Sequence, residues 1–290
     1  MKKIFITGSC GFLFSNFIRK SIFQKLDYNI SSIDSISNNI LSNVYQNKNH
    51  SFYIGNCSDD HLLNIIFLSD NPDIIIHGAF DSNLSKNLEI TTKLLERSKN
   101  KKFIYISSDE VYGQSNSFLN ENSTLNPSSS EGISKLLCEN LVKDYCKINK
   151  INYNIIRVSN YFGPRQSKNS ELLKAFQCFT SNQKYFQTEN KISNYGYVAD
   201  AVNGIVQIID SNLTNEVFNL SGDAHSFHDV LTELEKILEV KDLVVQSNNT
   251  NKIILDNSKL KSIGWQPEFN LSSGLTSFAQ WYLNNKWWFK

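Results

Sequence analysis

The chain has 290 residues, a formal net charge of +1 and 40% hydrophobic side chains. This length suits one large α/β domain, or a large and a small one, with a proper core. The balanced charge gives no reason to expect a nucleic acid polymer or a membrane surface as partner, and no apolar run is long enough to span a bilayer. The five cysteines are scattered and form no C-x-x-C pair, which indicates neither a metal site nor a disulfide framework. We therefore expect a cytoplasmic globular protein.

The N-terminus predicts a short buried strand, a glycine turn and a helix. Residues 4–6 are apolar, Gly8 and Gly11 follow, and an apolar-periodic segment begins at Phe12. This order is typical of a dinucleotide-binding βαβ unit, whose glycines let the backbone turn tightly and approach a pyrophosphate at the helix start. Phe14 departs from this pattern, because it occupies the position of the third glycine, which normally lets helix and strand pack closely. The alternative is a turn in another kind of α/β protein.

A second strand over residues 29–33 ends in Asp34. An acidic residue at this distance from the glycine turn can accept hydrogen bonds from the adenosine ribose hydroxyls, so Asp34 favours NAD over NADP as the cofactor. The alternative for Asp34 is a helix N-cap.

Strands and helices alternate through the first half of the chain. Further strands are predicted over 51–54, 72–77, 102–107 and 153–158, and helices over 84–98 and 131–148. This alternation predicts an α/β fold with a Rossmann-type doubly wound parallel sheet, whose ligand lies at the carboxyl ends of the strands. The residues that fall there are Gly8, Asp34, Ala79, Ser108 and Asn160.

The second half is less regular and has no clear linker. Helices are predicted over 172–178, 195–209, 227–238 and 272–285, and strands over 217–220 and from residue 253. We expect a NAD-binding Rossmann domain over 1–165, with 194–222 returning to it. The remaining segments, 166–193 and 223–290, should form a smaller, interwoven C-terminal substrate-binding domain.

Four motifs resemble those of nucleotide-sugar 4,6-dehydratases, such as dTDP-glucose 4,6-dehydratase, within the extended short-chain dehydrogenases/reductases. Residues 107–113 resemble the T-D-E-V-Y-G signature, and residues 157–164 resemble R-x-S-N-N-Y-G-P. Residues 256–267 resemble D-x-S-K-I-x-x-x-L-G-W-x-P, and residues 280–288 resemble the ending W-Y-x-x-N-x-x-W-W. The order and spacing hold over nearly the whole chain, and Gly-x-x-Gly is the short form of the glycine turn used by this family.

The resemblance implies a reaction in which NAD takes a hydride from the sugar C4 and returns it to C6, with loss of water in between. Two adjacent carboxylates with divided roles suit this elimination. Asp109 would be the acid at O6, Glu110 the base at C5, and Ser108 would hydrogen-bond the substrate O4. The alternative for Asp109 and Glu110 is a polar strand end that caps the next turn.

The residue expected to be the base of the hydride step is changed. The family uses the Tyr of Y-x-x-x-K, but here Glu131 stands at that position and only Lys135 is kept. A carboxylate beside a lysine could accept a proton. The alternative is a surface-type i,i+4 pair that merely supports the helix.

Other departures fall on phosphate-contact and cofactor-packing positions. Two family arginines that suit a diphosphate are missing, one replaced by Ser193 and the other lost from a segment that keeps only Lys252. Asn56 replaces a usual Asp, and the segment after the fourth strand is shortened to residues 78–83. This distribution suggests a chain that kept its architecture but changed or lost its chemistry, although the Asp-Glu pair and Asn160 survive.

The candidate site residues form three groups, and no metal is expected. Catalytic candidates are Ser108, Asp109, Glu110, Glu131 and Lys135. Cofactor-binding candidates are Gly8, Cys10, Gly11, Phe12, Leu13, Asp34, Asn56, Cys57, Ala79 and Lys135. Substrate-binding candidates are Asp81, Ser108, Asn160 and Lys252. His77 is expected to be a hydrogen-bonded interior histidine.

Three hypotheses follow. The first is an NAD-dependent enzyme that modifies a nucleotide-diphosphate sugar in deoxysugar or surface-glycan biosynthesis. The second is a non-catalytic homologue that binds a dinucleotide or sugar nucleotide, or serves as a partner subunit. The third keeps catalysis but changes the substrate. The resemblance also implies a homodimer through helices 84–98 and 131–148, with apolar positions such as Ile133, Leu136, Leu137 and Leu141.

Overall fold

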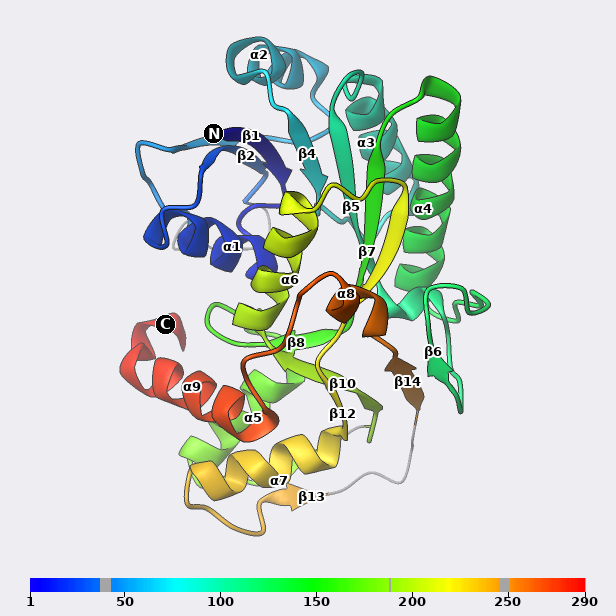
Figure 1. Cartoon of the computed structure of the whole chain (residues 1–290). Coiled ribbons are helices and arrows are strands. Elements are labelled where there is room, and N and C mark those ends of the chain that lie inside the picture. Colours follow the sequence, from blue (N-terminus) through cyan, green and yellow to red (C-terminus); the bar gives the residue numbers. More distant parts are fainter. Residues whose placement is uncertain (37–42, 188, 246–250, 290) are drawn as a thin grey trace. The chain divides into compact units, whose positions relative to one another are not determined.

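The computed structural model describes residues 1–36, 43–187, 189–245 and 251–289, and the chain forms two compact units (Figure 1). Unit 1 consists of Met1–Val111, Pro127–Arg157 and Ser211–Phe218. Unit 2 consists of Tyr112–Asn126, Val158–Asp210 and Asn219–Lys290. These boundaries differ from the predicted ones. Residues 112–126 and 158–165, predicted to lie in the Rossmann domain, belong to unit 2, and of 194–222 only 211–218 belongs to unit 1. That segment returns because it carries a strand that completes the edge of the sheet of unit 1.

Unit 1 is built on a seven-stranded sheet with the order β11-β7-β5-β4-β1-β2-β3 (Figure 1). The pairs β1–β2, β2–β3, β1–β4 and β4–β5 are parallel. The order reverses between β1 and β4, which is the switch point where ligands bind in doubly wound sheets. The predicted Rossmann-type fold is confirmed. The strands are β1 (Lys2–Thr7), β2 (Tyr28–Asp34), β3 (His50–Ile54), β4 (Ile74–His77), β5 (Lys102–Ser108), β7 (Tyr153–Val158) and β11 (Glu216–Leu220).

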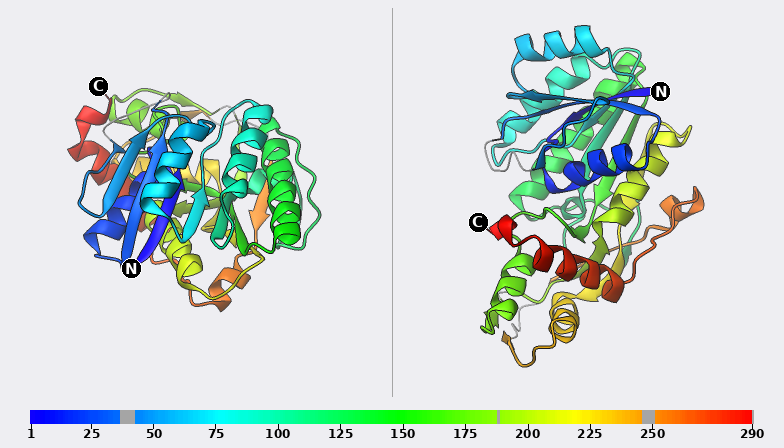
Figure 2. Two further views of the ribbon diagram at one scale, coloured as in Figure 1. Left: turned by 90° about the horizontal axis from the view of Figure 1, so that it is seen from above. Right: turned by 90° about the vertical axis from the view of Figure 1, so that its left-hand side faces the viewer.

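Four helices of unit 1 cover the sheet, namely α1 (Phe12–Phe23), α2 (Asp60–Asp70), α3 (Leu84–Glu96) and α4 (Ser130–Asn149). Phe5, Ile75 and Phe103 are neighbours in the strand register and are fully buried. They share one core cluster with side chains of α2, α3 and α4, and each such burial contributes roughly 1.5–3 kcal/mol. Helix α1 lies on the other face of the sheet (Figure 2), where Phe17 is buried and stacks on Tyr28.

Helix α2 was not among the predicted elements. Asp59 is its N-cap, and the side chain accepts hydrogen bonds from the N–H groups of His61 and Leu62. Leu63 and Ile66 face the core. The cap residue and this three-residue apolar spacing are the sequence signal for the helix.

The predicted helix over 195–209 begins three residues later than expected. Tyr195 belongs to strand β10 (Ile192–Tyr197), and the helix is α6 (Val198–Asp210). Residues 195–197 form a strand and not a helix because β10 pairs with three other strands. It is antiparallel to β12 (Asp223–Ser226) and parallel to β14 (Lys252–Leu255) and β8 (Asn160–Phe162). Long-range pairing of this kind overrides a local helical pattern.

Unit 2 surrounds the β10 sheet, whose remaining strand is β6 (Phe118–Leu119), with helices and a second, two-stranded sheet of β9 (Tyr185–Phe186) and β13 (Val244–Val245). Phe162, Phe176, Phe278 and Tyr282 form an aromatic core with ring centroids 4.8–6.1 Å apart. The helices besides α6 are α5 (Glu171–Thr180), α7 (Phe227–Ile237), α8 (Ser258–Ser262) and α9 (Leu271–Asn284). Among the described residues, no helix combines the length and apolar character needed to cross a membrane.

Candidate functional site

The glycine turn of unit 1 is fastened to the end of β4. Gly8 has φ +76°, a left-handed conformation that favours glycine, and its N–H donates to the Ile33 carbonyl at 3.0 Å. A Cβ on Gly8 would lie 2.8 Å from the Ala79 nitrogen. The Thr7 hydroxyl oxygen accepts from the N–H groups of Gly78 and Ala79 at 3.3 and 3.2 Å. The turn therefore has one defined position against the carboxyl end of β4.

Helix α1 starts directly after this turn. The Gly11 N–H donates to the Gly8 carbonyl, and Gly11 is the N-cap of α1. Phe12 and Leu13 form the first helical residues and are half-buried. The first N–H groups of a helix have no partner within it, so those of Phe12 and Leu13 can meet an anion.

Phe14 is buried in unit 1, with only 3% of its surface exposed. Its ring lies on Gly78, where an added Cβ would approach Phe14 Cε2 to 2.0 Å. The aromatic ring thus fills space that the missing side chain of Gly78 leaves open. Phe14 is thereby accommodated in the core of unit 1.

Asp34 links the end of β2 to the glycine turn. Its Oδ2 accepts from the Cys10 N–H at 2.9 Å, and its Oδ1 accepts from the Ile36 N–H at 2.9 Å. Each carboxylate oxygen can accept a further hydrogen bond, as a ribose hydroxyl would require. Burial, together with the Asp34 charge, raises the pKa of both Cys10 and Cys57 to about 12, so both thiols stay protonated and neutral.

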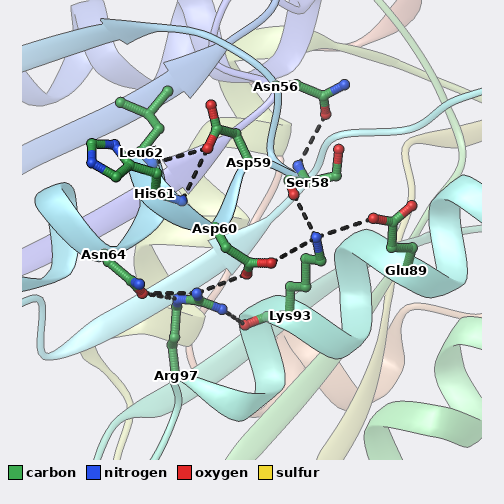
Figure 3. A network of polar contacts seen from close by, with 10 residues as sticks. All are labelled: Asn56, Ser58, Asp59, Asp60, His61, Leu62, Asn64, Glu89, Lys93 and Arg97. Carbon is green, nitrogen blue, oxygen red and sulfur yellow. Dashed lines mark hydrogen bonds and ion pairs between the residues drawn. The ribbon is translucent and has the colours of Figure 1, made fainter.

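The turn after β3 is held by a polar network from α3 (Figure 3). Asn56 Oδ1 accepts from the Ser58 N–H at 3.0 Å, and the Ser58 carbonyl accepts from Lys93 Nζ at 2.6 Å. Lys93 also pairs with Asp60 at 2.9 Å, and Arg97 Nη2 pairs with the same carboxylate at 2.8 Å. The network fixes the segment that carries Asn56 and Cys57 at the carboxyl end of β3.

His77 is an interior histidine, as predicted. Its Nδ1 lies 2.8 Å from the Thr7 hydroxyl and its Nε2 lies 3.1 Å from the Thr91 hydroxyl. Burial, and then the Lys135 charge, lower its pKa to about 3. The ring is therefore neutral and serves as a hydrogen-bonded link between β1 and α3.

The predicted catalytic triplet lies at the end of β5. Asp109 is buried, with 4% of its surface exposed, and its Oδ1 lies 3.3 Å from the Ser108 hydroxyl. The same hydroxyl oxygen accepts from the Glu110 N–H at 3.2 Å. Glu110 Oε2 accepts from the Ser129 hydroxyl at 3.1 Å. Ser129 is the N-cap of α4, so the Glu110 carboxylate is tied to the start of this helix.

Lys135 is buried in the second turn of α4, with 6% of its surface exposed. Its Nζ donates to the Ile106 carbonyl at 2.9 Å and lies 4.9 Å from the Phe80 ring centre and 5.4 Å from that of Tyr105. Burial lowers its pKa to about 8, although the Glu131 charge opposes this shift. Glu131 itself is exposed. A surface-type Glu–Lys pair is therefore not the arrangement here, because the lysine is interior.

One helical turn further along α4, Glu139 forms a buried ion pair that the sequence analysis did not single out. Arg157 Nε donates to Glu139 Oε1 at 3.0 Å, and Nη2 donates to Oε2 at 2.8 Å. Glu139 and Arg157 are 0% and 1% exposed. The pair joins α4 to β7 next to Lys135. The signal for it is the i,i+4 spacing of Glu131, Lys135 and Glu139 on one helix face.

The Asp81 side chain makes polar contacts with residues at the start of α3. Its Oδ1 accepts from the Asn83 N–H at 2.8 Å, and its Oδ2 lies 3.4 Å from Lys86 Nζ. The Asn87 side-chain amide donates to the Asp81 carbonyl and to the Ser134 hydroxyl, at 2.7 and 2.9 Å. Asp81 thus helps to join α3 to α4, and substrate contact by this residue stays a prediction.

Unit 2 contains a cavity of about 300 Å³. Its polar lining includes Asn160, Gln166, Glu171, Lys191 and Tyr195. Asn160 Nδ2 donates to the Ser193 hydroxyl at 2.8 Å. The sequence analysis missed Lys191, which directly precedes β10 and lines the cavity together with Tyr195.

Two polar atoms of the cavity lining are buried without a hydrogen-bond partner in the described part of the chain, the Tyr161 hydroxyl and Gln166 Oε1. Burial raises the pKa of Tyr161 well above its usual value, so the hydroxyl stays protonated. Lys252, predicted to bind substrate, does not line this cavity, and its Nζ lies 3.4 Å from the Asn116 carbonyl. Of the two predicted substrate contacts in unit 2, only Asn160 therefore faces the cavity.

Comparisons with known proteins agree with the motifs. The model of the NAD dependent epimerase/dehydratase family matches residues 4–221, well over half of the chain. A dTDP-D-glucose 4,6-dehydratase of Dictyostelium discoideum is 28% identical, over 99% of this chain and 82% of the relative. The corresponding protein of Mus musculus is 26% identical, over 98% of this chain and 89% of the relative. The structure of a Bacillus anthracis dTDP-glucose 4,6-dehydratase in complex with NAD superposes with a TM-score of 0.93 at 23% identity, covering 99% of this chain and 98% of that chain.

Proposed function

Since the chain belongs to the NAD dependent epimerase/dehydratase family, we propose that it is an NAD-dependent enzyme of the dTDP- or UDP-glucose 4,6-dehydratase type. It would modify a nucleotide-diphosphate sugar in deoxysugar or surface-glycan biosynthesis. The arrangement of Ser108, Asp109 and Glu110 at the end of β5 supports this most directly, because elimination needs two carboxyl groups in different environments. The relatives of this chain do not favour the non-catalytic alternative.

The residues around the glycine turn fit NAD. Gly8 lets the turn rest directly on the backbone of Gly78 and Ala79, where no Cβ would fit, and the start of α1 offers the N–H groups of Phe12 and Leu13 for the pyrophosphate. Asp34 would receive the adenosine ribose hydroxyls. Cys10 and Cys57 are neutral and would not repel the phosphates. Asn56, Ala79 and Lys135 complete the proposed cofactor contacts. When bound, NAD would supply the hydride acceptor for C4 and the donor for C6.

The two carboxylates would divide the elimination between them. Asp109 is buried and lies beside the Ser108 hydroxyl, an environment that suits a proton donor to the departing O6 hydroxyl. Glu110 is only partly buried, is held by Ser129, and would accept the proton from C5. Ser108 would orient the substrate O4.

Glu131 and Lys135 would handle the proton of the C4 hydroxyl in place of the family tyrosine. Glu131 precedes Lys135 by four residues, so both project from one side of α4. The exposed Glu131 carboxylate would accept the proton, and the Lys135 ammonium, anchored on Ile106, would stabilise the negative charge before transfer. A carboxylate is a weaker base than a phenolate, so slower hydride transfer than in a tyrosine-containing relative is expected.

The cavity of unit 2 would receive part of the substrate through Asn160. Because Ser193 replaces an arginine, the grip on a diphosphate is expected to be altered, which leaves room for a nucleotide sugar different from those of the relatives. Lys191, directly before β10, would supply one positive charge to the cavity lining.

We also propose a cytoplasmic homodimer. Leu84 of α3 and Ile133 and Leu137 of α4 are 37%, 44% and 40% exposed, and they would be covered by the same helices of a second copy. The five cysteines are free thiols, which suits a reducing compartment. A monomeric mass in light scattering at micromolar concentration would refute the dimer.

The first test is cofactor retention. The purified protein is denatured, and the supernatant is assayed for NAD and NADH. The stripped protein is then titrated with NAD and incubated with dTDP-glucose or UDP-glucose. The expected result is NAD binding and a product lighter by one water in mass spectrometry. No binding at millimolar NAD would remove the hydride acceptor and favour the non-catalytic homologue.

A further inference from the structure

Two positions far apart in the sequence, Phe14 and Gly78, have complementary side-chain volumes beside the glycine turn. Phe14 places a large ring where the dinucleotide fingerprint has its third glycine, and Gly78 has no side chain. The structure brings the two together, since an added Cβ on Gly78 would lie 2.0, 2.9 and 3.1 Å from three atoms of the Phe14 ring.

The need for glycine at position 78 is one of space. Unlike Gly8, Gly78 does not have a positive φ, so its backbone conformation is open to any residue. The three atoms nearest to its missing Cβ all belong to the Phe14 ring. That ring has little freedom to move away, because it is 3% exposed and packs edge-on against the buried Phe17 at 6.2 Å.

The backbone of Gly78 and Ala79 is also the surface on which the glycine turn rests. Both N–H groups donate to the Thr7 hydroxyl, and Gly8 approaches Ala79 so closely that no Cβ fits between them. A shift of this backbone by even a few tenths of an ångström would therefore shift the turn.

We propose that Phe14 and Gly78 are a matched pair that positions the glycine turn for the cofactor, with the aromatic ring of α1 replacing the side chain that Gly78, directly after β4, lacks. This inference rests on the proposed function, because it concerns the site proposed for NAD. Phe14 is thereby a positioning residue, and the identity of residue 78 is constrained by residue 14.

The test is a double-mutant cycle with Phe14→Ala, Gly78→Ala and the combined variant. Gly78→Ala alone should lower the melting temperature by roughly 3–10 °C and weaken NAD binding about 10-fold, because the methyl group forces the ring or the backbone to move. In the Phe14→Ala background, the same change should lower neither quantity further, since the obstacle is gone and alanine restricts the unfolded chain. Should Gly78→Ala fail to fold, folding of the combined variant would show the rescue.

Gly55→Ala is the matched control. Its added Cβ would meet only Leu62 and Ile33 side chains, so its effect should be the same with Phe14 or Ala at position 14. Melting temperatures are read by calorimetry and NAD affinities by titration calorimetry.

Equal losses from Gly78→Ala in both backgrounds would overturn the pairing. If the effect of Gly78→Ala on the melting temperature depends on residue 14 but no variant changes the NAD affinity, the positioning role would be overturned. If the wild-type protein binds no NAD, the proposed function fails and the positioning role with it, an outcome that differs from loss of coupling in a protein that does bind NAD.

Discussion

The buried pair of Glu139 and Arg157 gives the sharpest prediction of stability. The two side chains are 0% and 1% exposed, and two hydrogen bonds of 3.0 and 2.8 Å join them in a bidentate arrangement. Lys143 Nζ adds a third contact to the carboxylate at 3.3 Å. Charges this deeply buried are tolerated only while both partners are present.

Glu139→Gln keeps the shape of the side chain but removes its charge, so Arg157 becomes a buried cation without its carboxylate. Such a change lowers the free energy of unfolding by about 3–5 kcal/mol. Since a whole protein is stable by only about 5–15 kcal/mol, much of the stability should be lost. At about 2–4 °C per kcal/mol for chains of this size class, the melting temperature should fall by roughly 6–20 °C.

The combined Glu139→Leu and Arg157→Met variant is the control. With both charges replaced by apolar side chains of similar size, the desolvation penalty disappears together with the attraction, so stability should return to within about 1–2 kcal/mol of the wild type. Urea unfolding followed by circular dichroism measures all three proteins. A loss below 1 kcal/mol for Glu139→Gln, or a combined variant as unstable as the single one, would refute the reasoning.

The pH dependence of this pair has a definite sign. Burial alone would raise the pKa of Glu139, but the hydrogen bond and charge of Arg157 outweigh it, and the pKa lies below its usual 4.5. A lowered carboxyl pKa contributes stability above the unfolded value, and this contribution is lost as the pH falls through the folded value. The difference in unfolding free energy between the wild type and Glu139→Gln should be full at neutral pH and should shrink below pH 4.5.

Three further outcomes are expected. Lys93→Met removes the contacts that hold the Ser58 carbonyl and should weaken NAD binding about 10-fold, whereas Lys236→Met on the surface of unit 2 should leave the titration unchanged. Burial lowers the pKa of Lys135 to about 8, so between pH 8 and about 10 the unfolded chain still holds this proton while the folded chain has lost it. The free energy of unfolding of the wild type relative to Lys135→Met should therefore rise over this pH range. A difference in urea unfolding that does not change with pH would contradict the burial argument. Glu131→Gln should lower turnover about 10²-fold if this carboxylate accepts the C4 proton, while a gain of turnover in Glu131→Tyr would instead mark a decayed dehydratase site.

The sequence predicted the fold well where local patterns decide it. Apolar runs such as residues 4–6 and 103–106 form buried parallel strands, because strands covered on both faces carry little polar alternation. The predicted elements were wrong where strand pairing between distant parts of the chain determines the secondary structure. Tyr195 lies in a strand because β8, β12 and β14 offer partners from three separate parts of the chain. A strand near residue 216 joins a sheet begun at residue 2, so the predicted return of 194–222 to the first domain holds for 211–218.

The candidate site was predictable in part. Asp34 and Ser108 are the last residues of β2 and β5, and they lie at the carboxyl ends of these strands, where the ligand of such a sheet binds. The accommodation of Phe14 could not be foreseen, because it depends on the empty space at Gly78, which only the fold brings near. Lys191 was missed because it directly precedes β10, and the prediction had a helix from residue 195 and no strand in this region.

The late return of β11 has a consequence for synthesis on the ribosome. The seven-stranded sheet of unit 1 needs β11, whose segment Ser211–Phe218 is synthesised after Arg157. The sheet is therefore complete only once this segment has emerged from the ribosome. At about 5–20 residues per second, the intervening 61 residues from 158 to 218 take roughly 3–12 s. Until then β7 is an unpaired edge strand, open to pairing with another nascent chain. A fragment ending near residue 165 would keep that edge permanently, so expression of the N-terminal half alone should yield an aggregating protein.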